Sequence, residues 1–150
     1  MSKIIIREMN LQDVSAVFSV EQAGYEFPWS KSLFEQAVQS TKFCTVIELD
    51  SEIVGYAIVS FVVGEAELLN ICILPSMQGK GLARQLLDFS IEEATNKDNH
   101  EMYLEVRAGN TVALALYEKH DFNEIGCRKD YYPMKGGRED AILMARSLLF

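Results

Sequence analysis

The stretch "NICILPSMQGKGLARQLL", residues 70–87, passes from an apolar segment through a glycine loop into an amphipathic segment. Two glycines, Gly79 and Gly81, and two cations, Lys80 and Arg84, stand at this junction. A helix that begins here would offer about four unpaired backbone N–H groups and roughly half a positive charge. Glycine would let the backbone approach a ligand, because no Cβ intervenes. The junction is therefore either a tight strand-to-helix connection or a binding site for an anion such as a phosphate.

Hydrophobic periodicity on both sides of this loop predicts a mixed α/β fold. Strands are expected at residues 4–7, 43–49, 53–63, 66–74, 102–106, 122–128 and 141–145, and helices at 11–24, from 30–32 onward, at 82–94 and from 110 onward. Ser32 and Glu35 match a capping box for the second helix. The order β-α-α-β-β-β-α-β-α-β-β joins an antiparallel first half to a β-α-β-α-β second half. This order implies a mixed sheet with helices on both faces.

Length and composition predict a globular chain. The 150 residues are 49% hydrophobic and 24% charged, which favours a single domain over residues 1–150. The longest apolar run, residues 53–63, is shorter than the roughly 18 residues that a membrane helix needs. The opening "MSKIIIREMN" contains only three consecutive isoleucines, which is too short for a signal peptide. We therefore expect a cytoplasmic protein that does not bind membranes.

The charged and sulfur-containing residues narrow the function further. A net charge of −8 opposes general nucleic-acid binding, which requires a basic face, and an anionic ligand would need a local positive site. Cys44, Cys72 and Cys127 are far apart among apolar residues, so buried reduced thiols are expected, not a zinc site or a disulfide framework. His100 and His120 are isolated and expected at solvent. They indicate neither a metal cluster nor a Ser-His-Asp triad.

The glycine loop matches neither of two common nucleotide-binding patterns. The Walker A pattern G-x-x-x-x-G-K-[ST] fits nothing in the chain, and the dinucleotide fingerprint G-x-G-x-x-G fails at its third glycine, where Arg84 stands. The pattern Gln78-x-x-Gly81-x-Ala83 instead resembles the pyrophosphate loop of the GNAT acetyltransferase superfamily, which binds acetyl-coenzyme A (acetyl-CoA). The place of the loop, after an apolar strand and before an amphipathic helix, is also that of the superfamily.

The second half of the chain strengthens this resemblance. "LEVRAGNTVALALYEKHDF", residues 104–122, resembles the RimI-type branch of the superfamily, which acetylates the N-terminal alanine of a small-subunit ribosomal protein. The stretches "FPWS" (27–30), "GCRKDYYP" (126–133) and "EDAILM" (139–144) are similar to the same branch, so the resemblance covers nearly the whole chain. Two positions depart from it. Gly109 stands where the branch usually has Ser, and Asp121 stands where it usually has Gly, although Asp tolerates a left-handed backbone better than most residues.

The resemblance implies both a fold and an activity. The fold would be GNAT-like, with a mixed, mostly antiparallel, twisted sheet of about seven strands and about four helices on its two faces. The activity would be acetyl transfer from acetyl-CoA to the N-terminal alanine of small-subunit ribosomal protein number eighteen, by direct attack in a ternary complex and without a metal. The partner would be the basic N-terminal peptide of that protein. Two alternatives stay open: acetylation of a protein lysine or a small amine, and a non-catalytic acyl-CoA sensor.

The resemblance also implies a set of residues that bind acetyl-CoA. They are Ile71, Cys72, Ile73, Gln78, Gly79, Lys80, Gly81, Leu82, Ala83, Arg84, Asn110 and Tyr117. The backbone of the strand containing Ile71 and Ile73 would pair with the pantetheine arm, and its N–H groups could stabilise an oxyanion. The side chains of that strand belong to the core. Asn110 is most simply a helix cap, and a contact to the coenzyme is compatible with that role.

Two residues are implied as catalytic. Glu105 lies between Leu104 and Val106, so alternation directs its side chain to the opposite face of the strand. By itself this pattern is typical of a solvated glutamate, whereas the resemblance implies a general base, acting directly or through a water. Tyr117 follows Asn110 by seven positions in the predicted helix. It is either a core residue or, by resemblance, the general acid for the coenzyme thiolate.

Four aromatic residues are candidates for binding the acceptor: Phe27, Trp29, Tyr131 and Tyr132. The prolines among them, Pro28 and Pro133, suggest ordered loops and not strand interiors. These aromatics form either a small satellite core or a cleft for an extended N-terminal peptide. Glu65 and Glu67 could attract a basic peptide, although a solvated hairpin edge explains them equally well.

Overall fold

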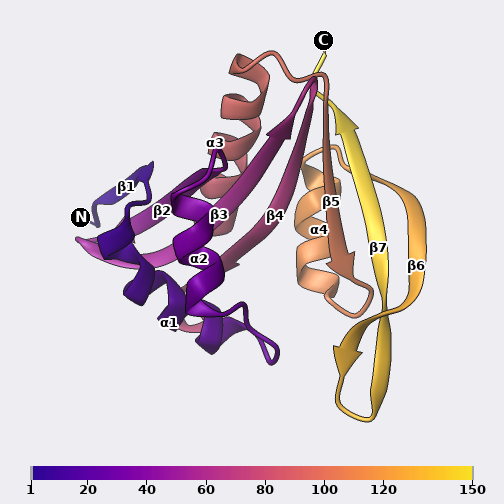
Figure 1. Cartoon of the computed structure of the whole chain (residues 1–150), viewed down its shortest axis with the longest axis horizontal. Helices are drawn as coiled ribbons and strands as arrows, with labels where there is room; N and C mark the ends of the chain where they lie inside the picture. Colours follow the sequence, from indigo (N-terminus) through magenta and orange to yellow (C-terminus); the bar gives the residue numbers. More distant parts are fainter. Residues whose placement is uncertain (1, 150) are drawn as a thin grey trace.

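The computed structural model of the chain describes residues 2–149, which form a seven-stranded sheet and four α-helices (Figure 1). The strands are β1 (Ile4–Glu8), β2 (Phe43–Leu49), β3 (Glu52–Val62), β4 (Glu65–Ile73), β5 (Glu101–Arg107), β6 (Asn123–Met134) and β7 (Gly137–Ser147). The helices are α1 (Val14–Gly24), α2 (Lys31–Val38), α3 (Leu82–Asn96) and α4 (Thr111–Lys119), with 3₁₀ turns at Leu11–Asp13 and Pro75–Met77. The predicted order of elements and the mixed α/β class are confirmed.

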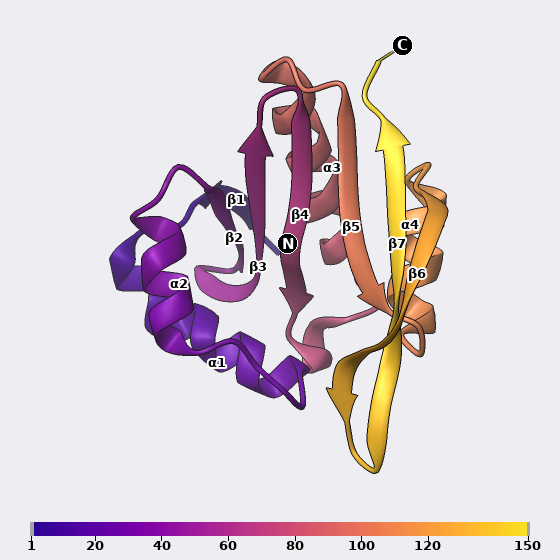
Figure 2. The same cartoon turned by 45° about the vertical axis from the view of Figure 1, so that its right-hand side comes forward.

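The sheet has the strand order β1-β2-β3-β4-β5-β7-β6. Its neighbouring strands are antiparallel except for β4 and β5, which run parallel. The parallel pairing is short, because only residues 65–68 of β4 pair with residues 101–104 of β5. Past this point the two strands diverge toward their carboxyl ends (Figure 2). The divergence leaves one edge of β4 unpaired by β5 beside the glycine loop.

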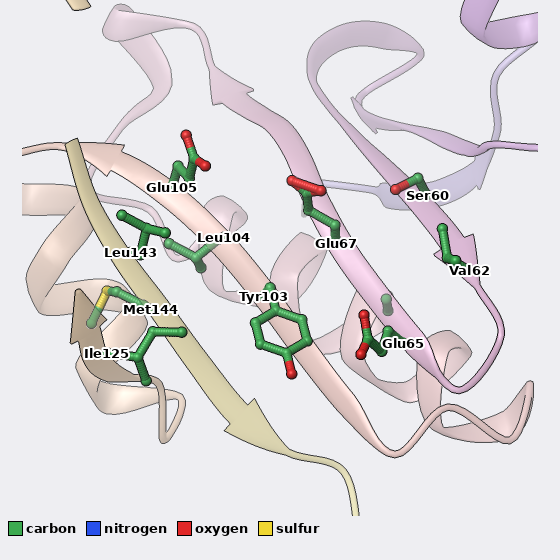
Figure 3. A pocket seen from close by; sticks show the side chains of 11 residues that line it. Ser60, Val62, Glu65, Glu67, Tyr103, Leu104, Glu105, Ile125, Leu143 and Met144 are labelled. Carbon is green, nitrogen blue, oxygen red and sulfur yellow. The ribbon is translucent and has the colours of Figure 1, made fainter. Parts of the chain in front are cut away.

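Helices cover both faces of the sheet, as predicted. α1 and α2 lie on one face, where Val17 and Phe34 pack with Tyr56 and Ile58 of β3. α3 and α4 lie on the other face, where buried leucines of α3 and Tyr117 of α4 join a second core with β3, β4 and β5 (Figure 1). The side of the sheet that carries α1 and α2 is uncovered over β5 and β7, where Tyr103 and Leu143 lie (Figure 3).

α2 begins at Lys31, within the predicted range, but its cap differs from the prediction. The cap is Ser30, whose backbone is extended and whose hydroxyl accepts a hydrogen bond from the Leu33 N–H at 3.2 Å. Ser32 already lies inside the helix, and its hydroxyl accepts from the Gln36 side chain at 3.2 Å. The capping box at Ser32 is therefore wrong, because the chain becomes helical two residues earlier than the Ser-x-x-Glu pattern suggested.

The aromatic segment near residue 131 also differs from the prediction. Tyr131, Tyr132 and Pro133 lie within β6 and not in a loop. β6 is an edge strand that pairs only with β7, and its register is irregular between Arg128 and Tyr132. An edge strand tolerates proline, because one side of its backbone has no ladder bonds to lose.

Two smaller expectations fail for the same reason, that exposure depends on the tertiary fold. Cys127 is exposed on the edge strand β6, whereas Cys44 and Cys72 are buried as predicted. His100 is exposed as predicted, but the side chain of His120 is only 10% exposed, and its Nε2 lies 3.0 Å from a carboxylate oxygen of Asp88.

Gly55 provides a test of how tightly β3 packs against β4. A Cβ at this position would lie 2.8 Å from the backbone oxygen of Cys72 and 2.9 Å from Cγ2 of Ile47. The Cys72 oxygen cannot move away unless β4 moves, so Gly55→Ala is expected to lower the free energy of unfolding by about 1–3 kcal/mol. Urea denaturation measures this loss. Gly126→Ala is the matched control, since a Cβ there meets no described atom within 4 Å. Equal midpoints for the two variants would contradict the prediction.

Candidate functional site

The unpaired edge of β4 presents two backbone N–H groups next to the glycine loop. The Leu74 N–H donates to the Val54 oxygen at 2.8 Å, so the backbone N–H of Leu74 points toward β3. Alternation along the strand then directs the backbone groups of Ile71 and Ile73 to the opposite edge, away from β3. Two hydrogen bonds agree with this direction: the Tyr25 hydroxyl donates to the Ile71 oxygen at 2.6 Å, and the Gln78 side chain donates to the Ile73 oxygen at 3.3 Å. An extended ligand could pair with this edge as an added strand.

A bulge lies at the point where β4 leaves β5. Ile58 of β3 pairs with Asn70, but the next residue, Val59, pairs with Leu68, so Leu69 is an extra residue in β4. A bulge bends its strand and increases the local twist. The bulge therefore helps to turn the carboxyl half of β4 away from β5.

A cleft of about 400 Å³ extends from this edge over the glycine loop to α4. Its lining includes Ile71, Cys72, Ile73, Gln78, Gly79, Gly81, Leu82, Ala83, Arg84, Asn110 and Tyr117. All of these are residues that the resemblance to the GNAT superfamily implied for acetyl-CoA binding. Lys80, the remaining residue of that set, is exposed and does not line the cleft. We call this the cofactor cleft.

The conformation and charge of the glycine loop suit the binding of an anion. Gly79 and Gly81 have φ angles of +81° and +76°, a left-handed conformation that glycine adopts without strain. Gly81 is the N-cap of α3 and, among the described residues, no side chain caps this helix end. The N–H groups of the first turn thus remain available, and the Arg84 guanidinium lies 3.5 Å from the position of a Cβ on Gly81. Amides, helix dipole and guanidinium together give the local positive site that a chain of charge −8 needs.

Tyr117 is a buried residue that lines the cofactor cleft. The Asn110 side chain caps α4 by accepting from the Ala113 N–H at 3.2 Å, as predicted, and places Tyr117 two turns into the helix. The Tyr117 ring packs edge-on against Phe122, with 6.0 Å between ring centroids. Burial raises the pKa of Tyr117 above its ordinary value, so its hydroxyl stays protonated at neutral pH.

A second cleft, of about 150 Å³, opens on the other side of the diverging strands. We call it the acceptor cleft. Phe27 and Trp29 from the α1–α2 connection form one wall, and Tyr132 of β6 lies in the other. Tyr131 does not line it; this exposed ring packs against Tyr132 and lies 5.4 Å from the Arg128 guanidinium. The two clefts share Tyr25, Ile71, Asn110 and Tyr117. They therefore meet at the free edge of β4.

Glu105 lines the acceptor cleft, on the face opposite the buried Leu104 and Val106, as its position in β5 predicts. Its carboxylate lies 3.3 Å from Nε of Arg128. Glu105 also borders an open groove of about 250 Å³ on the uncovered face of the sheet, where the side chain of Glu67 lies near it (Figure 3). Partial burial, and then the negative charge of Glu105, raise the pKa of Glu67.

Four polar or aromatic residues of the acceptor cleft were not predicted from the sequence: Glu21, Tyr25, Asn70 and Arg107. Glu21 is 1% exposed, and its carboxylate accepts hydrogen bonds from the Trp29 N–H at 2.7 Å, from the Asn70 amide at 3.0 Å and from the Tyr56 hydroxyl. It thereby ties the α1–α2 connection to β3 and β4. The available signal was the place of Glu21 on the apolar stripe of α1, four residues after Val17, where a carboxylate needs a buried partner.

Two negative findings concern the described residues. Between residues 2 and 149, no helix is long and apolar enough to cross a membrane. Over the same range, no group of three or more His, Cys, Asp or Glu side chains could hold a metal ion.

Comparisons with known proteins agree with this geometry. Residues 9–122 match the Acetyltransferase (GNAT) family. The chain is 38% identical over 140 residues to the ribosomal protein bS18-alanine N-acetyltransferase of Escherichia coli strain K12, with 93% of this chain and 95% of that protein covered. It is 37% identical over 142 residues to the protein of the same name from Haemophilus influenzae, with 94% and 97% covered.

Among solved structures, the chain is similar to the crystal structure of the ribosomal-protein-S18-alanine N-acetyltransferase from Escherichia coli. The TM-score is 0.94 at 36% identity, and the match covers 99% of this chain and 96% of that chain. The likeness thus extends over nearly all of the sheet and the helices that form the two clefts.

Proposed function

The chain belongs to the GNAT acetyltransferase family, and we propose that it transfers the acetyl group of acetyl-CoA to the N-terminal alanine of ribosomal protein bS18. The observation that carries this proposal is the meeting of two clefts at the free edge of β4, one with an anion-binding loop and one with aromatic walls. A ribosomal protein as acceptor also implies that the enzyme acts in the cytoplasm.

The residues of the cofactor cleft are suited to bind the diphosphate and the pantetheine arm of acetyl-CoA. The N–H groups at the start of α3, with Gly79, Gly81 and Arg84, would bind the diphosphate. The N–H groups of Ile71 and Ile73 would pair with the arm, and one of them would donate to the acetyl oxygen as negative charge develops there. Acetyl-CoA supplies the activated acyl group as a thioester.

On the acceptor side, Glu105 would take the proton that the amine must lose. An N-terminal amine has a pKa of roughly 8, so about a tenth of it is already neutral at pH 7, compared with about one lysine in a few thousand. An N-terminal amine is therefore easier to deprotonate at neutral pH than a lysine side chain. The amine nitrogen then forms a bond to the acetyl carbon as the carbon–sulfur bond breaks.

Tyr117 would complete the reaction by protonating the departing sulfur to give free CoA. Burial raises the pKa of the Tyr117 hydroxyl, which by itself makes it a weaker acid. The sulfur anion would form in the same buried place and be destabilised by the same loss of solvent. The two pKa values are therefore raised together, and proton transfer between them stays close to balanced.

The cysteine nearest the site does not favour a covalent acetyl-enzyme. Cys72 lies in β4, and burial raises the pKa of its thiol to about 12, so it is protonated at neutral pH. Only a thiolate would be an effective nucleophile, which supports direct transfer between the two bound substrates.

A panel of three acceptors tests the proposed function by thiol release in the presence of acetyl-CoA. We expect turnover with a basic peptide that begins with alanine. A lysine peptide with a blocked N-terminus and a polyamine should be poor acceptors. Preferential turnover of either of these two would replace the proposed acceptor. Binding of acetyl-CoA with no turnover of any acceptor would indicate a sensor.

A further inference from the structure

Arg107 stands between the two walls of the acceptor cleft. It is the last residue of β5, on the same strand face as Glu105, and its side chain is 28% exposed. Its guanidinium carbon lies 4.5 Å from the ring centroid of Tyr132 and 5.7 Å from that of Phe27. Phe27 belongs to the α1–α2 connection and Tyr132 to β6, so one cation contacts aromatic rings from both walls.

A hydrogen-bond network holds this guanidinium in place. Its Nη1 donates to the Pro133 oxygen at 2.8 Å and lies 3.4 Å from Oε1 of Glu139. The other oxygen of Glu139 accepts from the Gly109 N–H at 2.7 Å. A Cβ on residue 109 would lie 2.5 Å from that oxygen, so the glycine at this position permits the close approach. Arg107 is thus linked to the start of α4, the helix that carries Tyr117.

The contact to Phe27 distinguishes Arg107 from a simple hairpin staple. The contacts to Tyr132, Pro133 and Glu139 all lie within β6 and β7 and would stabilise that hairpin whatever the enzyme acts on. Phe27, in contrast, lies in the α1–α2 connection, which is not part of this hairpin. The cation–π contact to Phe27 instead reaches across the acceptor cleft to a different part of the fold.

We propose that Arg107 is a positioning residue that fixes the width of the acceptor cleft and so favours an acceptor whose first side chain is small. This inference rests on the proposed function. The cleft it spans is about 150 Å³ in volume, and a bridge between its walls limits the room for a longer first side chain beside the peptide backbone. Arginine suits the role because its planar guanidinium can contact rings and carbonyl oxygens at once, as a lysine ammonium cannot.

Steady-state kinetics of Arg107→Met test the inference with two peptides that differ only in beginning with alanine or leucine. We expect KM for the alanine peptide to rise about tenfold, because contacts of a partly desolvated cation are lost. The preference in kcat/KM for alanine over leucine should fall, while KM for acetyl-CoA stays unchanged. Arg107→Lys should give intermediate values. Lys97→Met is the matched control, since Lys97 lies 5.9 Å from the ring of Phe61 at the far end of α3.

An unchanged preference for alanine over leucine in a folded Arg107→Met variant would overturn the inference, even if its melting temperature fell. A second readout does not need activity. Trp29 is the only tryptophan of the chain and lies two residues after Phe27. Its emission should become easier to quench with acrylamide in Arg107→Met than in the wild type. Unaltered quenching would also overturn the inference. A wild-type enzyme that fails with the alanine peptide would instead contradict the proposed function.

Discussion

Replacing Tyr117 with phenylalanine is expected to lower kcat about 100- to 10,000-fold, the usual contribution of a general acid or base. The substitution removes only the hydroxyl. The ring remains and keeps its edge-on contact with Phe122 in the core beside α4. Because the fold and the cofactor cleft stay intact, the affinity for acetyl-CoA should change little, and the loss should fall on the chemical step.

The measurement is kcat with the alanine peptide, together with calorimetry of acetyl-CoA binding to the same variant. Tyr103→Phe is the matched control, because the Tyr103 hydroxyl donates to Glu101 at 2.5 Å on the uncovered face of the sheet, outside both clefts. Wild-type kcat in Tyr117→Phe would remove Tyr117 as the proton donor. A parallel loss of acetyl-CoA binding would make it a binding residue instead.

Replacing Glu105 with glutamine is expected to lower kcat/KM about 100- to 10,000-fold at pH 7, and the loss should shrink as the pH rises. The direction follows from the acceptor. An N-terminal amine with a pKa of roughly 8 is about one-tenth neutral at pH 7 and about nine-tenths neutral at pH 9, so a base is needed less at the higher pH. Glutamine keeps the size and polarity of the side chain but cannot take a proton.

A pH–rate profile of wild type and Glu105→Gln between pH 6 and pH 9 checks this expectation. Glu101→Gln is the matched control, since Glu101 lies on the same face of β5 four residues earlier and outside the acceptor cleft. Full activity of Glu105→Gln over the whole pH range would exclude Glu105 from the mechanism. A loss of equal size at every pH would indicate that Glu105 orients the acceptor without accepting its proton.

Much of the fold follows from local patterns in the chain. Alternation of apolar residues placed Glu105 on the face opposite Leu104 and Val106, and this is how β5 presents it. The loop glycines Gly79 and Gly81 adopt positive φ angles, and so does Asp121, a residue type that tolerates this conformation better than most. These features are set by steric preferences of one residue or by spacings within one element, so a single sequence contains them.

Other expectations failed where several local choices were equally good. Ser30 and Ser32 are both acceptable caps, and the structure uses Ser30. Pro133 suggested a loop, yet β6 accommodates it because this strand is at the edge of the sheet. Cys127 was expected to be buried but faces solvent on the same strand. The outcomes at Pro133 and Cys127 depend on which strand becomes an edge, and neighbouring residues do not contain that information.

The residues of the site likewise divide into those that could be predicted from the sequence and those that only the folded chain brings together. Residues of the glycine loop and of the "LEVRAGN" segment could be named in advance, because helix starts and strand faces are local and the resemblance to GNAT acetyltransferases implied their roles. The buried Glu21, the hydroxyl of Tyr25 on the Ile71 oxygen and the guanidinium of Arg107 between two rings emerged only from the folded chain. Each has a partner distant in sequence: Asn70 is 49 positions from Glu21, and Ile71 is 46 positions from Tyr25. The β4 edge that Tyr25 meets is open because β4 and β5 pair over a few residues and then diverge. Sheet geometry, which no short stretch encodes, created the opening in which these side chains come together.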